Sequence, residues 1–282
     1  MKDALEDRMK NNYENRAKTY LVRRMPVIIR LDGRAFHTFT RGLKKPYDGV
    51  FHDAMNETMK YLCENIQGCK LGYTQSDEIT LLLTDFDTLT TDAWFDYNVQ
   101  KLCSVAASMA TLAFNKYFRL AVDNWGYEKF GLTWYDGGGD DSEFVNLAQT
   151  YSSKFDSATF DARCFNIPIE EVCNCFIWRQ NDATHNAINM LGQCYFSHKE
   201  LQGKSRNEVQ DMLMVQKGIN FNDMPTEFKR GTCCTRKESE KKQIINGMEV
   251  SVQHSAWIID KEIPIFTQDR DYIENIFKDL GL

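Results

Sequence analysis

Two aspartates, Asp32 and Asp77, stand where their residue type and setting could support metal-dependent phosphate chemistry. Asp32 follows the apolar run VIIRL, so it marks the point where a buried strand enters a tight turn. The segments 70–75 and 79–84 flank a short polar centre that contains Asp77, which is typical of a hairpin. Mg²⁺ takes few protein oxygens and leaves coordination positions for phosphate. The sequence therefore predicts that Asp32, the Gly33 carbonyl and Asp77 hold two Mg²⁺ ions where a nucleoside triphosphate reacts.

The residues around these aspartates could bind the nucleotide. The turn after Asp32 carries basic and aromatic side chains, which could neutralise phosphate or stack on a base. We expect the triphosphate to contact Ser76 and the segment after the first strand, which comprises Gly33, Arg34, Ala35, Phe36 and His37, with Phe39 close behind. Glu78 is a third candidate catalytic carboxylate. Because successive side chains on a strand point to opposite faces, Glu78 should face away from Asp77 and rank below the two aspartates.

The same motifs also have interpretations without catalysis. An Asp-Gly pair after a strand is most often a plain turn, and an acidic hairpin tip is most often only solvated. The alternatives are a nucleotidyl cyclase or forward polymerase, a catalytically idle RNA-binding module, and a metal-free interaction domain. Loss of Asp32 or Asp77 would be the signature of the idle module, and both are present. A metal-free domain would leave the paired aspartates unexplained.

Composition limits the class of protein. The chain has 282 residues and 43% apolar content, enough for a sizeable core in one large domain or two intimate ones. Neither a membrane span nor a signal peptide is visible, which favours a cytoplasmic protein. The nine cysteines include no CxxC pair, so we expect small buried hydrophobes rather than disulfides or a zinc site. A net charge of −6 argues against non-specific coating of nucleic acid by bulk charge.

The first half of the chain reads as strand, helix, hairpin and helix. Helices are predicted at 2–23, packed on the body, around 51–62, and at 94–119. This order is typical of an α+β, ferredoxin-like polymerase or cyclase palm, an antiparallel sheet backed by two helices. In the long helix, Lys101, Ser104 and Ser108 are spaced to face one ligand. We add to the expected nucleotide-binding residues Lys44, from the basic loop between the first strand and its helix.

The second half adds helical and hairpin extensions. We expect a strand at 160–166, helices at 169–191, 207–216 and 269–280, and a hairpin turn at Asn246-Gly247. The glycine-rich stretch 137–142 lacks flanking strands, so it is interpreted as a mobile loop rather than a cyclase motif. A palm domain over 1–155 and an extension over 156–282 would form one compact unit. A local basic cluster could meet RNA or be a solvated loop, and consists of Lys229, Arg230, Arg236, Lys237, Lys241 and Lys242.

Three motifs in order carry a family resemblance: RLDGRAFHTF from residue 30, GYTQSDE from residue 72 and WRQND from residue 178. FKRGTCC and IPIFTQDRDYI extend it through most of the chain. The sequence resembles the tRNA-His guanylyltransferase family and its "like" proteins, which are 3′-to-5′ polymerases. The resemblance implies that ATP activates the 5′-phosphate of a tRNA, which the 3′-hydroxyl of an incoming nucleotide then attacks. It also implies a dimer of dimers.

The resemblance assigns roles to individual residues. The family's metal aspartates fall on Asp32 and Asp77, its nucleotide-binding stretch on residues 32–37 with Ser76, and its helix lysine on Lys101. The chain departs from the eukaryotic pattern at residues 97–99, where basic residues are replaced. It also departs at ATHNAIN, where a compact HINN is expected, which favours repair of truncated tRNA over strict tRNA-His specificity. RNA contacts are expected from Arg179, whose guanidinium fits a phosphate fork better than His185 does, and from Asn186, Lys229 and Arg230, while the role of Asn189 stays open.

Overall fold

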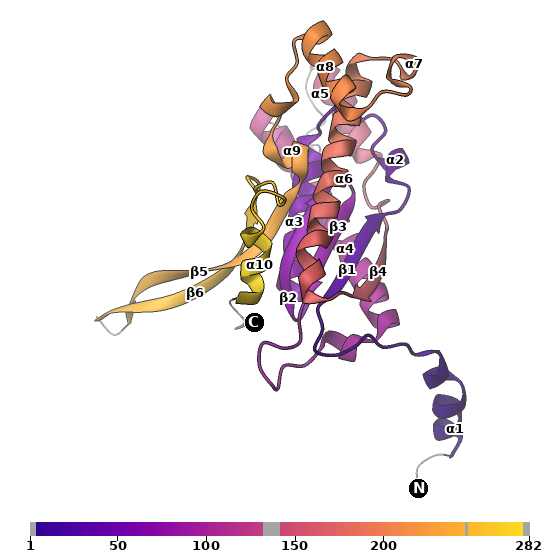
Figure 1. The fold of residues 1–282 in the computed structure, drawn as a ribbon, viewed down its shortest axis with the longest axis vertical. Helices are drawn as coiled ribbons and strands as arrows, with labels where there is room; N and C mark the ends of the chain where they lie inside the picture. Colours follow the sequence, from indigo (N-terminus) through magenta and orange to yellow (C-terminus); the bar gives the residue numbers. More distant parts are fainter. Residues whose placement is uncertain (1–3, 132–141, 246–247, 279–282) are drawn as a thin grey trace.

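The computed structural model describes residues 4–131, 142–245 and 248–278. Its centre is an antiparallel sheet of six strands in the order β4-β1-β3-β2-β5-β6 (Figure 1). The strands span Val27–Gly33 (β1), Cys69–Gln75 (β2), Glu78–Leu83 (β3), Phe160–Asn166 (β4), Thr232–Ile245 (β5) and Met248–Asp260 (β6). The order of the first four strands is the ferredoxin-like arrangement, so the predicted α+β palm is confirmed.

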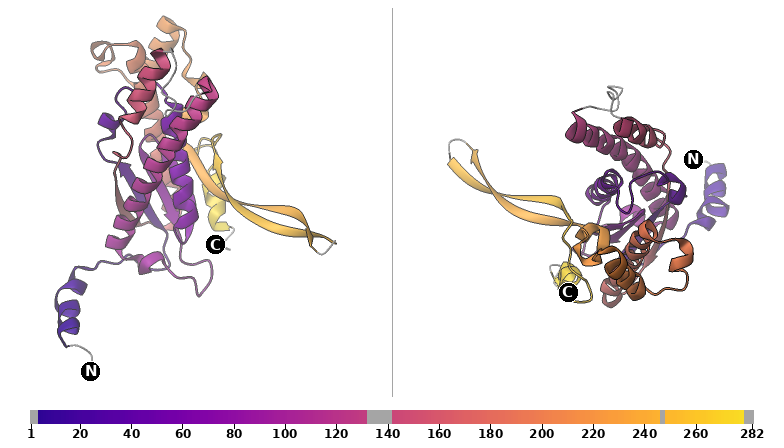
Figure 2. Two further views of the ribbon diagram at one scale, coloured as in Figure 1. Left: turned by 180° about the vertical axis from the view of Figure 1, so that it is seen from behind. Right: turned by 90° about the horizontal axis from the view of Figure 1, so that it is seen from above.

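Two layers of helix cover the sheet because its strands are apolar on both faces. On one face, α3 (Gly49–Asn65) and α4 (Val99–Phe130) pack on alternate strand residues such as Ile29 and Leu81. On the other face, α6 (Ile169–Tyr195) and α10 (Asp271–Lys278) pack on the strand residues that alternate with the first set, including Ile28 and Leu82 (Figures 1 and 2). The sheet therefore holds its strand ends between two rigid layers.

Local signals fix the helix boundaries near the strand ends. Asp48 caps α3 by accepting a hydrogen bond of 2.9 Å from the Phe51 N–H, and Asn98 caps α4 through the Lys101 N–H at 3.0 Å. The α4 helix ends at Gly131 in the left-handed conformation, with φ at 67°. The remaining helices are α2 (Phe36–Phe39), α5 (Ser142–Ser152), α7 (His198–Leu201), α8 (Arg206–Lys217), α9 (Thr226–Arg230) and the 3-10 turns Glu14–Ala17, Trp94–Tyr97 and Phe221–Asp223.

The N-terminal helix differs from its prediction. α1 spans only Ala4–Asn12, contains no buried residue and stands away from the sheet (Figure 1). The predicted packing of this helix on the body is therefore wrong, because its amphipathic pattern shows an apolar face without showing what covers it. The connection that follows does join the body, where the Leu21 N–H donates to the Tyr97 carbonyl at 3.0 Å.

Three further expectations are revised or extended. The long helix α4 begins at Val99 rather than Trp94, and α5 was not expected at all. The predicted loop at 137–142 lies outside the described residues except for Ser142, which begins α5. Both β4 and β5 lie beyond residue 155 but belong to the palm sheet, so one sheet runs across the predicted domain boundary.

The described part of the chain also bears on membrane association and cysteine chemistry. Within residues 4–131, 142–245 and 248–278, no helix is both long enough and apolar enough to cross a membrane. All nine cysteines are free thiols and most are buried, as expected for small hydrophobes.

Candidate active site

The end of β1 and the β2–β3 turn bring the two predicted metal aspartates together. Asp32 is the penultimate residue of β1 and pairs in register with Glu78, the first residue of β3. Asp77 lies in the two-residue turn before it, and the Gly33 N–H donates to the Asp77 carbonyl at 3.0 Å. Ser76, in the left-handed conformation at φ 50°, donates its hydroxyl to Asp77 Oδ1 at 3.0 Å. The two carboxylates are therefore held by the backbone of neighbouring strands.

The electrostatics of this pair suit a divalent cation. Burial raises the pKa of Asp77, and the negative charge of Asp32 raises it further. Asp32 remains accessible, with 45% of its side chain exposed. Within the described residues, no group of three or more His, Cys, Asp or Glu side chains could hold a metal on its own. Two neighbouring carboxylates, one of them open to solvent, still fit Mg²⁺ because the ion uses few protein ligands and takes others from phosphate and water.

The segment after β1 is shaped by the core. Phe36 is 2% exposed, and its ring lies 4.9 Å from that of Phe39 and 5.1 Å from that of Phe160, between ring centroids. The expectation that the Phe36 and Phe39 rings stack on a base is therefore wrong, since the core buries them. Arg34 and His37 are exposed, as is Ala35. Any contact of this segment with a nucleotide would thus involve the backbone or those exposed side chains.

Glu78 lies against α6, on the same face of the sheet as Asp32, which is its partner across the β1–β3 ladder. Its Oε2 accepts a hydrogen bond of 3.3 Å from Arg179 Nη1 and lies 3.9 Å from Arg30 Nε. Burial raises the pKa of Glu78, while Arg179 and then Arg30 act to lower it. Arg30 was missed in the sequence, although a basic residue inside an apolar strand signals a buried counter-charge. Glu78 is therefore part of an ion-pair cluster with Arg30 and Arg179 that lies beside Asp32.

Arg179 has a different setting from the one expected. Only 7% of its side chain is exposed, and its Nη2 donates to Asp182 Oδ2 at 2.7 Å. Its guanidinium carbon lies 4.1 Å from the centroid of the Trp178 ring. This placement speaks against the predicted contact of Arg179 with an RNA phosphate, because both terminal nitrogens already have carboxylate partners.

The other predicted RNA-binding residues lie on the middle part of α6 or beside it. The Lys229 carbonyl accepts from Thr184 Oγ1 at 2.9 Å, and the Arg230 carbonyl accepts from the Tyr73 hydroxyl at 2.7 Å. Arg230 Nε is buried and has no hydrogen-bond partner among the residues of the described ranges. Asn186 Nδ2 donates to Asp182 at 3.4 Å. The fold thus brings residues from α6 and α9 to one region beside β2.

The remaining nucleotide-binding candidates are spread along α4 and the loop before α3. Lys101, Ser104 and Ser108 are all exposed, as their spacing predicts, and Ser108 lines a cavity with Thr159 near the end of β1. A helix rises about 1.5 Å per residue, so Lys101 lies roughly 10 Å along α4 from Ser108. The structure therefore places Ser108 nearer to this end of β1 than Lys101.

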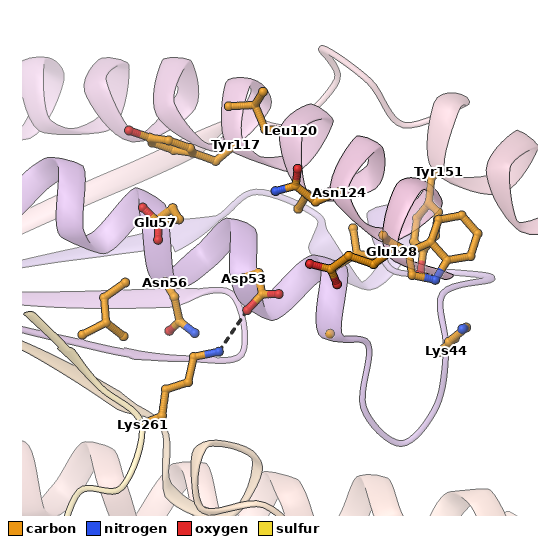
Figure 3. A pocket seen from close by; sticks show the side chains of 15 residues that line it. Lys44, Asp53, Asn56, Glu57, Tyr117, Leu120, Asn124, Glu128, Tyr151 and Lys261 are labelled. Atoms are coloured by element: carbon orange, nitrogen blue, oxygen red, sulfur yellow. Dashed lines mark hydrogen bonds and ion pairs between the residues drawn. The ribbon is translucent and has the colours of Figure 1, made fainter. Parts of the chain in front are cut away.

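Lys44 lies in a separate pocket between α3, α4 and the end of β6 (Figure 3). The pocket has a volume of about 560 Å³ and includes Asp53, which binds Lys261 Nζ at 3.0 Å. None of Asp32, Ser76 and Asp77 is among its lining residues. The structure thus does not bring Lys44 into the same pocket as the aspartates.

A palm sheet with two neighbouring carboxylates at its strand ends is compatible with nucleotidyl transfer, although the fold alone does not define the activity. Comparison with known proteins identifies the family, because the model of the tRNAHis guanylyltransferase (Thg1) family matches residues 6–168. The chain belongs to the tRNAHis guanylyltransferase family, whose members are nucleotidyltransferases.

Solved and curated proteins agree with this assignment. A bacterial tRNA(His) guanylyltransferase (Thg1)-like protein, solved in complex with ATP, is 41% identical, with 97% of this chain and 99% of that chain covered and a TM-score of 0.76. A second such structure, in complex with GTP, is 39% identical over 99% of this chain and 100% of that chain, with a TM-score of 0.73. The tRNA(His) guanylyltransferase of Saccharomyces cerevisiae is 26% identical over 225 residues, which cover 75% of this chain and 82% of that protein.

Proposed function

We propose that this protein transfers nucleotides to the 5′ end of tRNA in the 3′-to-5′ direction. The observation that carries the proposal is the Asp32–Asp77 pair, tied by the Gly33 N–H at 3.0 Å on the palm of a chain from the tRNAHis guanylyltransferase family. The relatives solved with ATP and with GTP support nucleoside triphosphates as substrates. A bound Mg²⁺ pair would supply Lewis-acid stabilisation of the charge that develops on the phosphates.

The chain's own residues bind and orient the reactants. Asp32, Asp77 and the Gly33 carbonyl would hold the cations, and the Ser76 hydroxyl with the backbone of residues 33–37 would bind the triphosphate. In the first step, the tRNA 5′-phosphate attacks the α-phosphate of ATP, and pyrophosphate leaves. In the second step, the 3′-hydroxyl of the incoming nucleotide attacks the activated 5′-phosphate, and AMP leaves.

A second anion site would serve the tRNA 5′ end or the second triphosphate. The exposed face of α4 carries Lys101, Ser104 and Ser108, which supply one cation and two hydroxyls. Arg230 and Lys229 supply positive charge at the end of α9, and Arg230 Nε is buried without a partner among the described residues. We assign these two basic residues, with Asn186, to RNA binding.

We further propose repair of truncated tRNA 5′ ends as the main activity, because ATHNAIN replaces the compact HINN associated with tRNA-His guanylylation. In α6, Asn189 Nδ2 and His185 Nε2 lie 2.9 Å apart, so the side chains of this stretch bond to each other within the helix. We also propose a cytoplasmic location and assembly as a dimer of dimers, both on the family resemblance.

The test compares two substrates, a tRNA that lacks its first nucleotide and a complete tRNA-His that lacks only the extra guanylate. Each carries a labelled 5′-phosphate, and the reaction contains Mg²⁺, ATP and all four nucleoside triphosphates. Nucleotide addition converts the label into an internal phosphodiester that phosphatase cannot remove. The adenylylated intermediate is also protected, so ribonuclease fragments of the protected tRNA are separated to distinguish it from the extended product. Repair is supported if the label of the truncated tRNA becomes protected faster and the added nucleotide is the one that completes the base pair. Repair is refuted if only the label of tRNA-His becomes protected. Binding without protection of either tRNA would favour the idle RNA-binding module.

A further inference from the structure

The ion-pair cluster beside Asp32 contains a buried arginine that no step of the proposed reaction uses. Arg179 donates to Glu78 at 3.3 Å and to Asp182 at 2.7 Å, while 7% of its side chain is exposed. A buried arginine between two carboxylates has a fixed orientation, because its planar guanidinium can satisfy both only in one arrangement. Trp178 lies against the same guanidinium, at 4.1 Å from the ring centroid to the guanidinium carbon.

Glu78 links this cluster to both metal aspartates through the backbone. It follows Asp77 directly and pairs in register with Asp32 across the β1–β3 ladder. The Thr74 hydroxyl donates to the Glu78 carbonyl at 2.9 Å, which closes the hairpin from its other strand. A displacement of the Glu78 backbone would therefore reach the turn that carries Asp77.

We propose that Arg179 is a positioning residue that holds Glu78 against α6 and thereby fixes Asp77 beside Asp32. This inference rests on the proposed function of the two aspartates. Without Arg179, the Glu78 carboxylate would be buried near the like charges of Asp32 and Asp182, and Arg30 at 3.9 Å would be its one remaining counter-charge among the described residues. Glu78 would then turn outward or draw a cation away from its place, and the geometry of the pair would be lost.

The test measures binding of Mn²⁺, as a paramagnetic substitute for Mg²⁺, together with a non-hydrolysable ATP analogue. Loss of a group that orients metal ligands lowers metal affinity by about 10- to 100-fold, and we expect Arg179→Met to fall in this range. Binding of intact tRNA should change less than about twofold, because Arg179 does not reach the nucleic acid. The matched control is Arg230→Met, which should weaken tRNA binding and its salt dependence while leaving Mn²⁺ binding unchanged.

Two further variants separate positioning from loss of the fold. Arg179→Lys keeps the charge but not the two-pronged geometry, so it should restore part of the Mn²⁺ affinity. Adding Glu78→Gln to Arg179→Met removes the unpaired buried charge and should restore thermal stability. If Arg179→Met alone does not fold, Mn²⁺ binding is measured on this double variant. A stable Arg179→Met protein with wild-type Mn²⁺ affinity and weakened tRNA binding would overturn the inference.

The outcome also separates this inference from the proposed function. If wild-type protein adds no nucleotide to tRNA but Arg179→Met still lowers Mn²⁺ affinity, the proposed function fails and the positioning role stands. If wild-type protein adds nucleotides and Arg179→Met binds Mn²⁺ normally, the positioning role fails alone.

Discussion

Replacing Gly33 with alanine is a small change that tests how the core shapes the active site. A Cβ atom at Gly33 would lie 2.4 Å from Cδ2 of Phe36 and 2.6 Å from its Cγ. That ring cannot easily move, since the rings of Phe39, Phe114 and Phe160 lie 4.9, 5.4 and 5.1 Å from it. Inserting a methyl group into a packed site of this kind costs about 1–3 kcal/mol.

The same change should disturb chemistry as well as stability. The Gly33 N–H holds the Asp77 carbonyl at 3.0 Å, so a displaced Gly33 moves both aspartates. For a domain of about this size, each kcal/mol lowers Tm by about 2–4 °C, and we expect Gly33→Ala to lower Tm by several degrees. Nucleotide addition should fall by at least tenfold, because reacting groups displaced by an ångström lose about a hundredfold in rate. Circular dichroism melting and the labelled-tRNA assay measure the two effects.

Gly49→Ala is the matched control, because a Cβ atom there meets nothing within 4 Å. It begins α3, where alanine is the better helix former, so Tm should stay constant or rise. Adding Phe36→Leu to Gly33→Ala should recover part of the lost stability by making room for the methyl group. The reasoning is refuted if Gly33→Ala melts and reacts like Gly49→Ala.

Three further predictions concern the scaffold. Asp85→Asn should lower the free energy of unfolding in urea by about 2 kcal/mol, because this fully buried carboxylate accepts from Arg23 Nε at 2.5 Å; a loss below about 0.5 kcal/mol would contradict this. Burial lowers the pKa of His52 to about 4, so the unfolded chain binds a proton before the folded protein does as pH falls from about 6.5 to 4. The free energy of unfolding of the wild type, measured in urea, should therefore fall by about 2 kcal/mol over that window. The same fall should be absent in His52→Phe, whose ring can keep the stack on Tyr47. Tyr151→Phe should cost about 1–2 kcal/mol in calorimetry, because the hydroxyl donates at 2.9 Å to the buried aspartate that caps α3; an unchanged Tm would refute that role.

Local patterns predicted the first four strands and the aspartate pair because both depend on short stretches of sequence. The β-branched run before Asp32 and the polar centre at Asp77 each define a turn without reference to the rest of the chain. Their meeting depends on the pairing of β1 with β3, which the element order of a ferredoxin-like palm predicts. The expectation of a ferredoxin-like palm rests on element order alone. It was therefore correct even though the predicted helix ends were wrong by several residues.

Long-range contacts decide what those patterns leave open. An aromatic residue after a strand can face a ligand or the core, and Phe36 faces the core because Phe114 and Phe160 arrive there from distant segments. Similarly, Arg179 and Glu78 are 101 residues apart in the chain, so no local spacing indicates their ion pair. Sequence alone therefore predicted which residues meet at the strand ends, but not which way the neighbouring side chains point.

The central claim is that Asp32 and Asp77 act together in nucleotide addition, and single replacements test it most directly. The measurement is the rate of phosphatase-resistant label formation on a tRNA lacking its first nucleotide, with Asp32→Asn, Asp77→Asn and the control Asp96→Asn. Asp96 is 70% exposed and pairs with Arg23 beside the start of α4. We predict that each of the first two variants loses about a hundredfold or more in rate, since each removes several kcal/mol of transition-state stabilisation. A wild-type rate for Asp32→Asn or Asp77→Asn, matching Asp96→Asn, would contradict the account.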